Sequence, residues 1–146
     1  MSPEDKRSVG LPTERDINRD DCLDGRVARD HFLGKTVEEA ELLFRENSFY
    51  YQEDLLFMGP VAFRYYLPAV VAYLRSDHSA DDDLIVSGLY GLIESRLDHE
   101  GRSIVTDHVH ELVDYVIANF DKFGDFVDPE FLADYRRLKT RLTDMA

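Results

Sequence analysis

From residue 36 onward, apolar residues recur every three or four positions, and no segment alternates with the period of two that strands show. A helix with this spacing has one apolar face, which another element has to cover. The chain has 146 residues, and 44% of them are hydrophobic, which is enough for one core. The sequence therefore predicts an all-α fold, a single compact domain of five or six helices.

Short polar signals mark the expected helix starts. Thr36 and Glu39 form a capping box, in which each side chain bonds the backbone of the other, before a helix over about 37–47. The later starts combine N-cap side chains with proline at the first helical position. They are Gly59-Pro60, Asp82 or Asp83 for a helix over about 84–97, Ser103 for one over about 104–121, and Asp128-Pro129-Glu130 for the last helix.

Two segments are expected to depart from regular helix. Pro68 lacks a backbone N–H and its ring clashes with the carbonyl of residue 64, so we expect a break between helices over about 60–67 and 69–76. Residues 1–30 contain scattered prolines, glycines and charges with few apolar residues, which predicts an irregular leader. The helical domain then spans residues 31–146.

The charge is strongly negative and unevenly distributed. The net charge is −13, and residues 76–134 hold 15 acidic residues against three basic ones. Such a block repels phosphate, which argues against nucleic acid and anionic membrane surfaces and favours a basic protein partner. If the block is an interface, its acids should gather on one side beside exposed apolar surface. The candidate partner-binding residues are Asp81, Asp82, Asp83, Asp107, Glu111 and Asp114.

The sequence contains no recognisable catalytic, metal or cofactor motif. Gly34-Lys35-Thr36 resembles the end of a phosphate-binding loop, but Arg29 stands where that motif needs glycine. No two histidines have the i, i+4 spacing of a metal-binding helix, and the acids around His110 are better explained as a solvated face. No segment is long and apolar enough for a membrane span, and a single cysteine fits a reducing cytoplasm. We therefore predict no catalytic residues, no metal and no cofactor.

Aromatic residues are densest between positions 49 and 73, which contain eight of the 17 Phe and Tyr residues. Arg64, Tyr65 and Tyr66 lie in the middle of this segment. They form the candidate ligand-binding site, with Arg64 as an anchor for an anion. The alternative is a core with phenol groups tied at its rim. A buried Arg64 would need a carboxylate or carbonyl partner.

The run Phe63-Arg64-Tyr65-Tyr66-Leu67-Pro68-Ala69, preceded by the segment 32–41, resembles a family of small bacterial proteins of unknown function. The resemblance covers about residues 30–76. It implies no assigned catalytic residue, and some such proteins look like immunity proteins of toxin systems.

Two functions remain open from the sequence. The first is a non-enzymatic cytoplasmic interaction module that binds a basic protein through its acidic surface, as an immunity protein neutralises a nuclease-like toxin. The second is a small-molecule-binding or enzymatic domain with its site at Arg64, Tyr65 and Tyr66. A deep pocket lined by these side chains, with a buried acid of raised pKa, would favour the second. The sequence does not indicate the oligomeric state.

Overall fold

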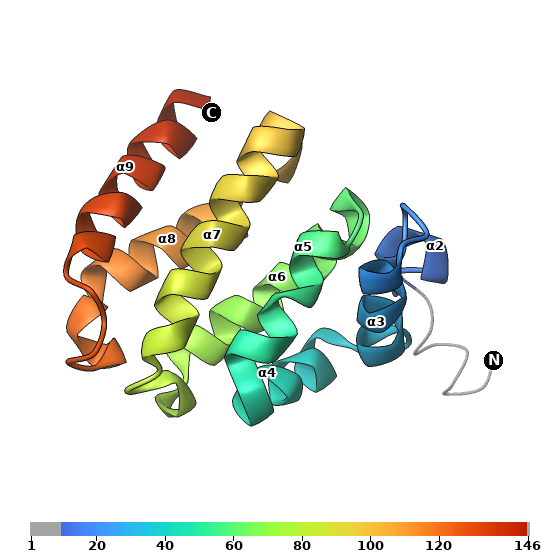
Figure 1. The fold of residues 1–146 in the computed structure, drawn as a ribbon, viewed down its shortest axis with the longest axis horizontal. Helices are drawn as coiled ribbons and strands as arrows, with labels where there is room; N and C mark the ends of the chain where they lie inside the picture. Colours follow the sequence, from blue (N-terminus) through green and yellow to red (C-terminus); the bar gives the residue numbers. More distant parts are fainter. Residues whose placement is uncertain (1–9, 146) are drawn as a thin grey trace.

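The computed structural model describes residues 10–145, and this part of the chain is all-helical, which confirms the fold class (Figure 1). It contains eight α-helices, more than the five or six expected, because three short or N-terminal helices were not predicted. The helices are α2 (Glu14–Ile17), α3 (Leu23–Phe32), α4 (Val37–Gln52), α5 (Asp54–Phe57), α6 (Pro60–Arg75), α7 (Asp83–Glu100), α8 (Asp107–Ala118) and α9 (Glu130–Met145). The 3₁₀ turns are η1 (Asp77–Ser79), η2 (Gly101–Ile104) and η3 (Phe120–Phe123).

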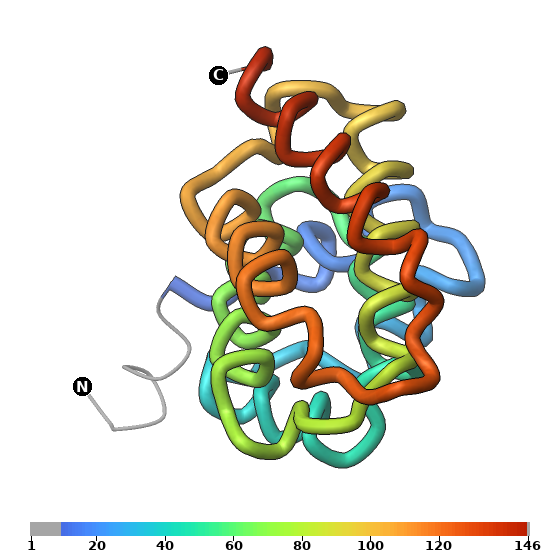
Figure 2. The backbone as a smooth tube through the Cα atoms, turned by 90° about the vertical axis from the view of Figure 1, so that its left-hand side faces the viewer, coloured from blue at the N-terminus to red at the C-terminus, as the bar shows by residue number. Residues whose placement is uncertain are grey.

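The helices form two layers around one continuous apolar core. In Figure 1, α3, α4, α7 and α9 lie side by side in front, with α6 and α8 behind them, and Figure 2 shows the same layers from the side. Helix α6 packs on α4 and α8, while α7 packs on α4 and α9. Within residues 10–145, no helix has the length and apolar character needed to cross a bilayer.

Helix α6 is the most buried element and runs unbroken through Pro68. The predicted break at this proline is therefore wrong. The residues on either side, Leu67 and Ala69, are fully buried, as is Val70. Tertiary packing around these buried residues therefore outweighs the local cost of one missing backbone hydrogen bond.

The irregular leader is also corrected, because α2 and most of α3 lie within residues 10–30. A capping box between Thr13 and Asp16 starts α2, and the Cys22 Sγ accepts a hydrogen bond from the Gly25 amide at the start of α3. Ile17 and Ala28 are fully buried, so these short helices are stabilised by the main core rather than by their own length. The predicted leader residues 1–9 lie outside the described part.

Most of the predicted helix starts are confirmed. Thr36 forms its capping box with Glu39, Asp82 caps α7, and Pro60 is the first residue of α6. The Asp128 carboxylate accepts the Glu130 amide at the start of α9.

Two helix boundaries differ in part from those expected: the start of the helix predicted after Ser103, and the end of the helix predicted after Thr36. Ser103 lies in η2 instead of capping a helix, and Thr106 caps α8. The expected end of the first helix at residue 47 matches a non-helical Asn47 within α4, whose side chain accepts the Tyr50 amide. Asn47 thus starts a second helical segment directly after the first.

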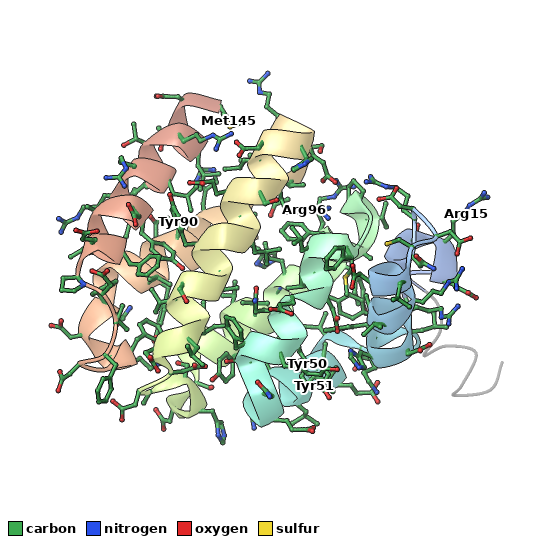
Figure 3. All side chains as sticks on the ribbon, in the orientation of Figure 1. Arg15, Tyr50, Tyr51, Tyr90, Arg96 and Met145 are labelled. Carbon is green, nitrogen blue, oxygen red and sulfur yellow. The ribbon has the colours of Figure 1, made fainter. Side chains whose placement is uncertain are left out.

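Arg96 of α7 is buried and holds the end of α5 (Figure 3). Its Nη1 donates to the carbonyls of Leu55, Leu56 and Met58, and its Nη2 lies 2.9 Å from a Glu100 carboxylate oxygen. Its guanidinium stacks 4.7 Å from the centroid of the Phe63 ring. Burial lowers the pKa of Arg96, although Glu100 opposes that shift.

The other two basic residues of the segment 76–134 also bind helix C-terminal ends. Arg102 donates from Nε to the Met145 carbonyl at the end of α9, at 2.7 Å. Lys122 donates from Nζ to the carbonyls of Leu74 and Ser76 at the end of α6, at 2.6 and 2.9 Å. These carbonyls have no partner within their helix, and a cation there also interacts favourably with the helix dipole.

The contacts of Arg96 predict a large stabilising role. Arg96→Met keeps an apolar side chain but leaves the carbonyls at the end of α5 without their donor and Glu100 with only Arg19, at 3.6 Å. The free energy of unfolding should therefore fall by about 3 kcal/mol. Chemical denaturation measures this change. Arg141→Met is the control, because Arg141 pairs with exposed Asp98 and should cost about 1 kcal/mol or less. Equal losses in the two variants would contradict the assignment.

A candidate protein-binding surface

Arg64, Tyr65 and Tyr66 of α6 make contacts with different parts of the structure. The half-buried Arg64 donates from Nη1 to the Ser103 carbonyl at 2.8 Å. The buried Tyr66 hydroxyl bonds the carbonyls of Phe32 and Lys35 at 2.8 and 2.9 Å. Burial raises the pKa of Tyr66, which keeps its hydroxyl protonated as a donor.

Tyr65 is half-buried and packs edge-on against the Tyr66 ring, with 4.9 Å between the ring centroids. The five best-formed hollows in residues 10–145 are lined by other side chains. The partner expected for Arg64 is present, as a backbone carbonyl. The contacts of Arg64 and Tyr66 therefore tie α6 to η2 and to the α3–α4 loop.

The six candidate acids separate into groups. Asp82 is turned into the protein, where its carboxylate accepts from the Tyr73 hydroxyl at 2.6 Å, from the Ser48 hydroxyl and from the Ile85 amide. Burial, reinforced by the Asp82 carboxylate, raises the pKa of Tyr73. Asp82 is thus an N-cap and a half-buried acceptor, and Asp81 and Asp83 lie on either side of it in sequence.

Asp107, Glu111 and Asp114 line a shallow hollow of about 700 Å³ along α8. Two of them already have cationic partners. Glu111 lies 2.9 Å from Arg75, and Asp114 lies 2.8 Å from Lys139. His110 also lines this hollow. Within residues 10–145, no group of three or more His, Cys, Asp or Glu side chains is placed to hold a metal ion.

Asp81 and Asp83 lie where the start of α7 meets the loop after α8, at the lower end of α7 in Figure 1. The Asp81 amide donates to the Lys122 carbonyl at 2.9 Å, and a Cβ added to Gly124 would lie 3.3 Å from the Asp81 carboxylate. We call this region the acidic corner. Its carboxylates are Asp81, Asp83, Asp121, Asp125 and Asp128.

Within residues 10–145, the carboxylates of the acidic corner form no ion pair. Four of the five are exposed, and Asp83 is half-buried. Among the ion pairs of residues 10–145, none includes any of the five. Lys122 lies in the same loop, but its three donors are all used, by two carbonyls at the end of α6 and by the Tyr115 hydroxyl.

Exposed apolar side chains come from the two segments that meet at the acidic corner. Leu84, at the start of α7, is 53% exposed, and Phe126, in the loop after η3, is 92% exposed. A phenylalanine this exposed loses the free energy that burial of its ring would supply. Sequence analysis missed Phe126; the signal was its position in a loop between Asp125 and Asp128.

A second cluster that the sequence did not indicate joins α3 to α5. His31 Nδ1 lies 2.6 Å from the buried Asp54 carboxylate. The rings of Tyr50 and Tyr51 pack edge-on around the imidazole, at 5.4 and 5.1 Å between centroids. Burial raises the pKa of Asp54, and the bond from His31 only partly offsets that shift. The pair holds α3 and α5 together.

Comparison with known proteins gives no family or relative. No protein-family model matches the chain, and neither a curated protein nor a solved structure matches it. The resemblance of the Phe63–Ala69 run to an uncharacterised bacterial family stays a prediction. The candidate surface therefore rests on its own geometry.

The placement of Arg64 predicts a small contribution to stability. Its single partner is a carbonyl in an exposed setting, so Arg64→Ala should lower the free energy of unfolding by about 1 kcal/mol or less. Thermal or chemical denaturation measures this. A loss several times larger would show that Arg64 holds a buried partner.

The environment of Asp54 predicts a pH effect. Because its pKa is higher in the folded than in the unfolded chain, its contribution to stability is present below the unfolded pKa and is lost as the pH rises through the folded pKa. Asp54→Asn keeps an acceptor for His31 and removes the buried charge, so it should be more stable than the parent at pH 7. Denaturation at pH 3 to 8 tests this, and a less stable variant at pH 7 would refute it.

Proposed function

We propose that this protein is a non-enzymatic interaction module that binds a basic protein partner through the acidic corner. The observation that carries the proposal is that the two segments meeting at the acidic corner carry exposed Leu84 and Phe126, while their carboxylates form no ion pair within residues 10–145. Interfaces combine an apolar centre, which supplies affinity, with a charged rim, which speeds association and selects the partner. Asp81 and Asp83 of the candidate acids belong to this rim.

Charge supports a basic partner over other classes. The chain has a net charge of −13, and the bases of the segment 76–134 bind helix C-terminal carbonyls. The acids of the corner therefore keep their negative field. Such a field attracts cationic protein surfaces over distances of about a Debye length and repels phosphate backbones.

The alternative, a small-molecule or enzymatic site at Arg64, Tyr65 and Tyr66, has less support from the geometry. Arg64 and Tyr66 donate to backbone carbonyls on different neighbouring segments. A buried acid with a raised pKa is present, but it is Asp54, which pairs with His31. The interaction surface is therefore the better supported function.

The proposal predicts that substitutions in the acidic corner weaken binding of the protein partner. Phe126→Ser combined with Asp125→Lys removes the apolar anchor and reverses one rim charge without touching the core. Both side chains are exposed, so the unfolding midpoint should stay that of the parent. Affinity enrichment from extract of the source cells, followed by quantitative mass spectrometry, should show a basic protein retained by the parent and reduced at least tenfold on the variant.

The matched control is Leu23→Ser with Asp24→Lys on α3, which also alters an exposed leucine and a neighbouring exposed acid. It should retain the partner as the parent does. Equal retention by the corner variant and the parent would contradict the proposal, as would the absence of any retained basic protein.

A further inference from the structure

An apolar groove lies between α4–α5 and α7. It has a volume of about 370 Å³. Its walls include Phe49 and Leu56, each 37% exposed, and Leu92 lies deeper. Gly88 and Gly91 of α7 form part of its floor. Glu53 is the one charged side chain among the groove residues, so the groove is apolar with a negative edge.

Helix packing within the chain explains why Gly88 is a glycine, but it does not explain Gly91. A Cβ at Gly88 would lie 2.9 Å from Gln52 Nε2 and 3.3 Å from the Phe49 ring, so glycine lets α4 approach α7 there. A Cβ at Gly91 would meet nothing within 4 Å. Glycine inside a helix is destabilising relative to alanine, and no contact within residues 10–145 requires it at Gly91. The groove therefore stays open at a cost to the helix.

The face of α7 that lines the groove leads toward the acidic corner. Leu84, Gly88 and Gly91 are spaced i, i+4 and i+7, which places them on one face of α7. Leu84 is exposed at the corner end of this face, about 10 Å along the helix axis from Gly91. Leu84 and the two glycines of the groove thus share one face of α7.

We propose that this groove binds an amphipathic α-helix of the basic partner, with small and apolar residues on its buried face and Lys or Arg on its flanks. This inference rests on the proposed function and adds the form of the ligand. An apolar trough beside a helix is a known mode of helix recognition, in which residues at i, i+3, i+4 and i+7 serve as anchors. The open floor at Gly91 lets the backbone of a partner helix come close.

Charge complementarity selects the occupant. Glu53 borders the groove, Asp83 precedes Leu84 at its end, and no basic side chain lines it. A helix with cationic flanks is attracted at both places, whereas a second copy of this chain brings a net charge of −13 against the same acids. The groove is therefore assigned to a different, basic protein.

A synthetic helical peptide tests the proposal directly. The probe has 16 residues, with Leu and Ala at i, i+3, i+4 and i+7 positions and Lys elsewhere, and carries a fluorophore. A second peptide has the same composition in scrambled order. Fluorescence anisotropy should show at least tenfold tighter binding of the first peptide, because both carry the same charge but only the first forms one apolar face.

Gly91→Leu fills the groove in the intact protein. The substitution meets open space and removes a helical glycine, so the unfolding midpoint should be no lower than that of the parent. Peptide affinity should fall at least tenfold. Gly91→Ala should bind with an intermediate affinity at the same or higher stability, which separates groove blocking from misfolding. Thr140→Leu adds an exposed leucine on α9 and should bind as the parent does.

The outcomes separate this inference from the function on which it rests. Peptide binding that is weakened by Asp125→Lys with Phe126→Ser but unchanged by Gly91→Leu would overturn the groove and leave the acidic corner as the site. Equal binding of the scrambled peptide would also overturn the groove. No binding of either peptide to the parent would count against both. Self-association of the parent that Gly91→Leu abolishes would assign the groove to a second copy and overturn the proposal.

Discussion

The C-terminal carbonyls of three helices bind the three basic side chains of the acidic segment, and the surface of the protein depends on this arrangement. Arg96 binds the end of α5, Arg102 the end of α9 and Lys122 the end of α6. The last carbonyls of a helix have no N–H donor within the helix, so other groups have to donate to them. Arg102 stays exposed, but Arg96 is buried and Lys122 is half-buried, so these two bonds turn positive charge inward. The carboxylates near Lys122 therefore form no ion pair within residues 10–145.

The acidic corner and the groove both follow from the packing of α7. Asp82 caps this helix and takes hydrogen bonds from Tyr73 and Ser48, which fixes its first turn against α6 and α4. Asp81 binds the loop after α8 and so brings Phe126 to the same end of the molecule. Gly88 allows α4 to cross closely, and beyond that crossing the helices leave the groove open. The acidic corner and the groove are thus built together from three segments that are distant in sequence: α4–α5, α7 and the loop after α8.

Local signals predicted the elements whose bonds span only a few residues. Thr36 with Glu39, Asp82, and Asp128 before Pro129 bind amides within four positions, so neighbouring residues suffice to identify them. The prediction at Pro68 failed because burial on both sides of α6 decided the outcome. The expected acidic interface stays a prediction. The sequence did not indicate that Glu111 and Asp114 form ion pairs with residues of other helices, nor that Phe126 is exposed, because both depend on contacts between distant segments.

The central claim is that the Lys122 ammonium group donates to the carbonyls at the end of α6 and forms no ion pair with the carboxylates of the acidic corner. Nuclear magnetic resonance of the ¹⁵N-labelled lysine ammonium groups tests it most directly. The account predicts slow hydrogen exchange at Lys122 Nζ and scalar couplings across its hydrogen bonds to the carbonyl carbons of Leu74 and Ser76. Exchange as fast as that of the exposed Lys139, with no such couplings, would place the Lys122 charge among the corner acids and contradict the account.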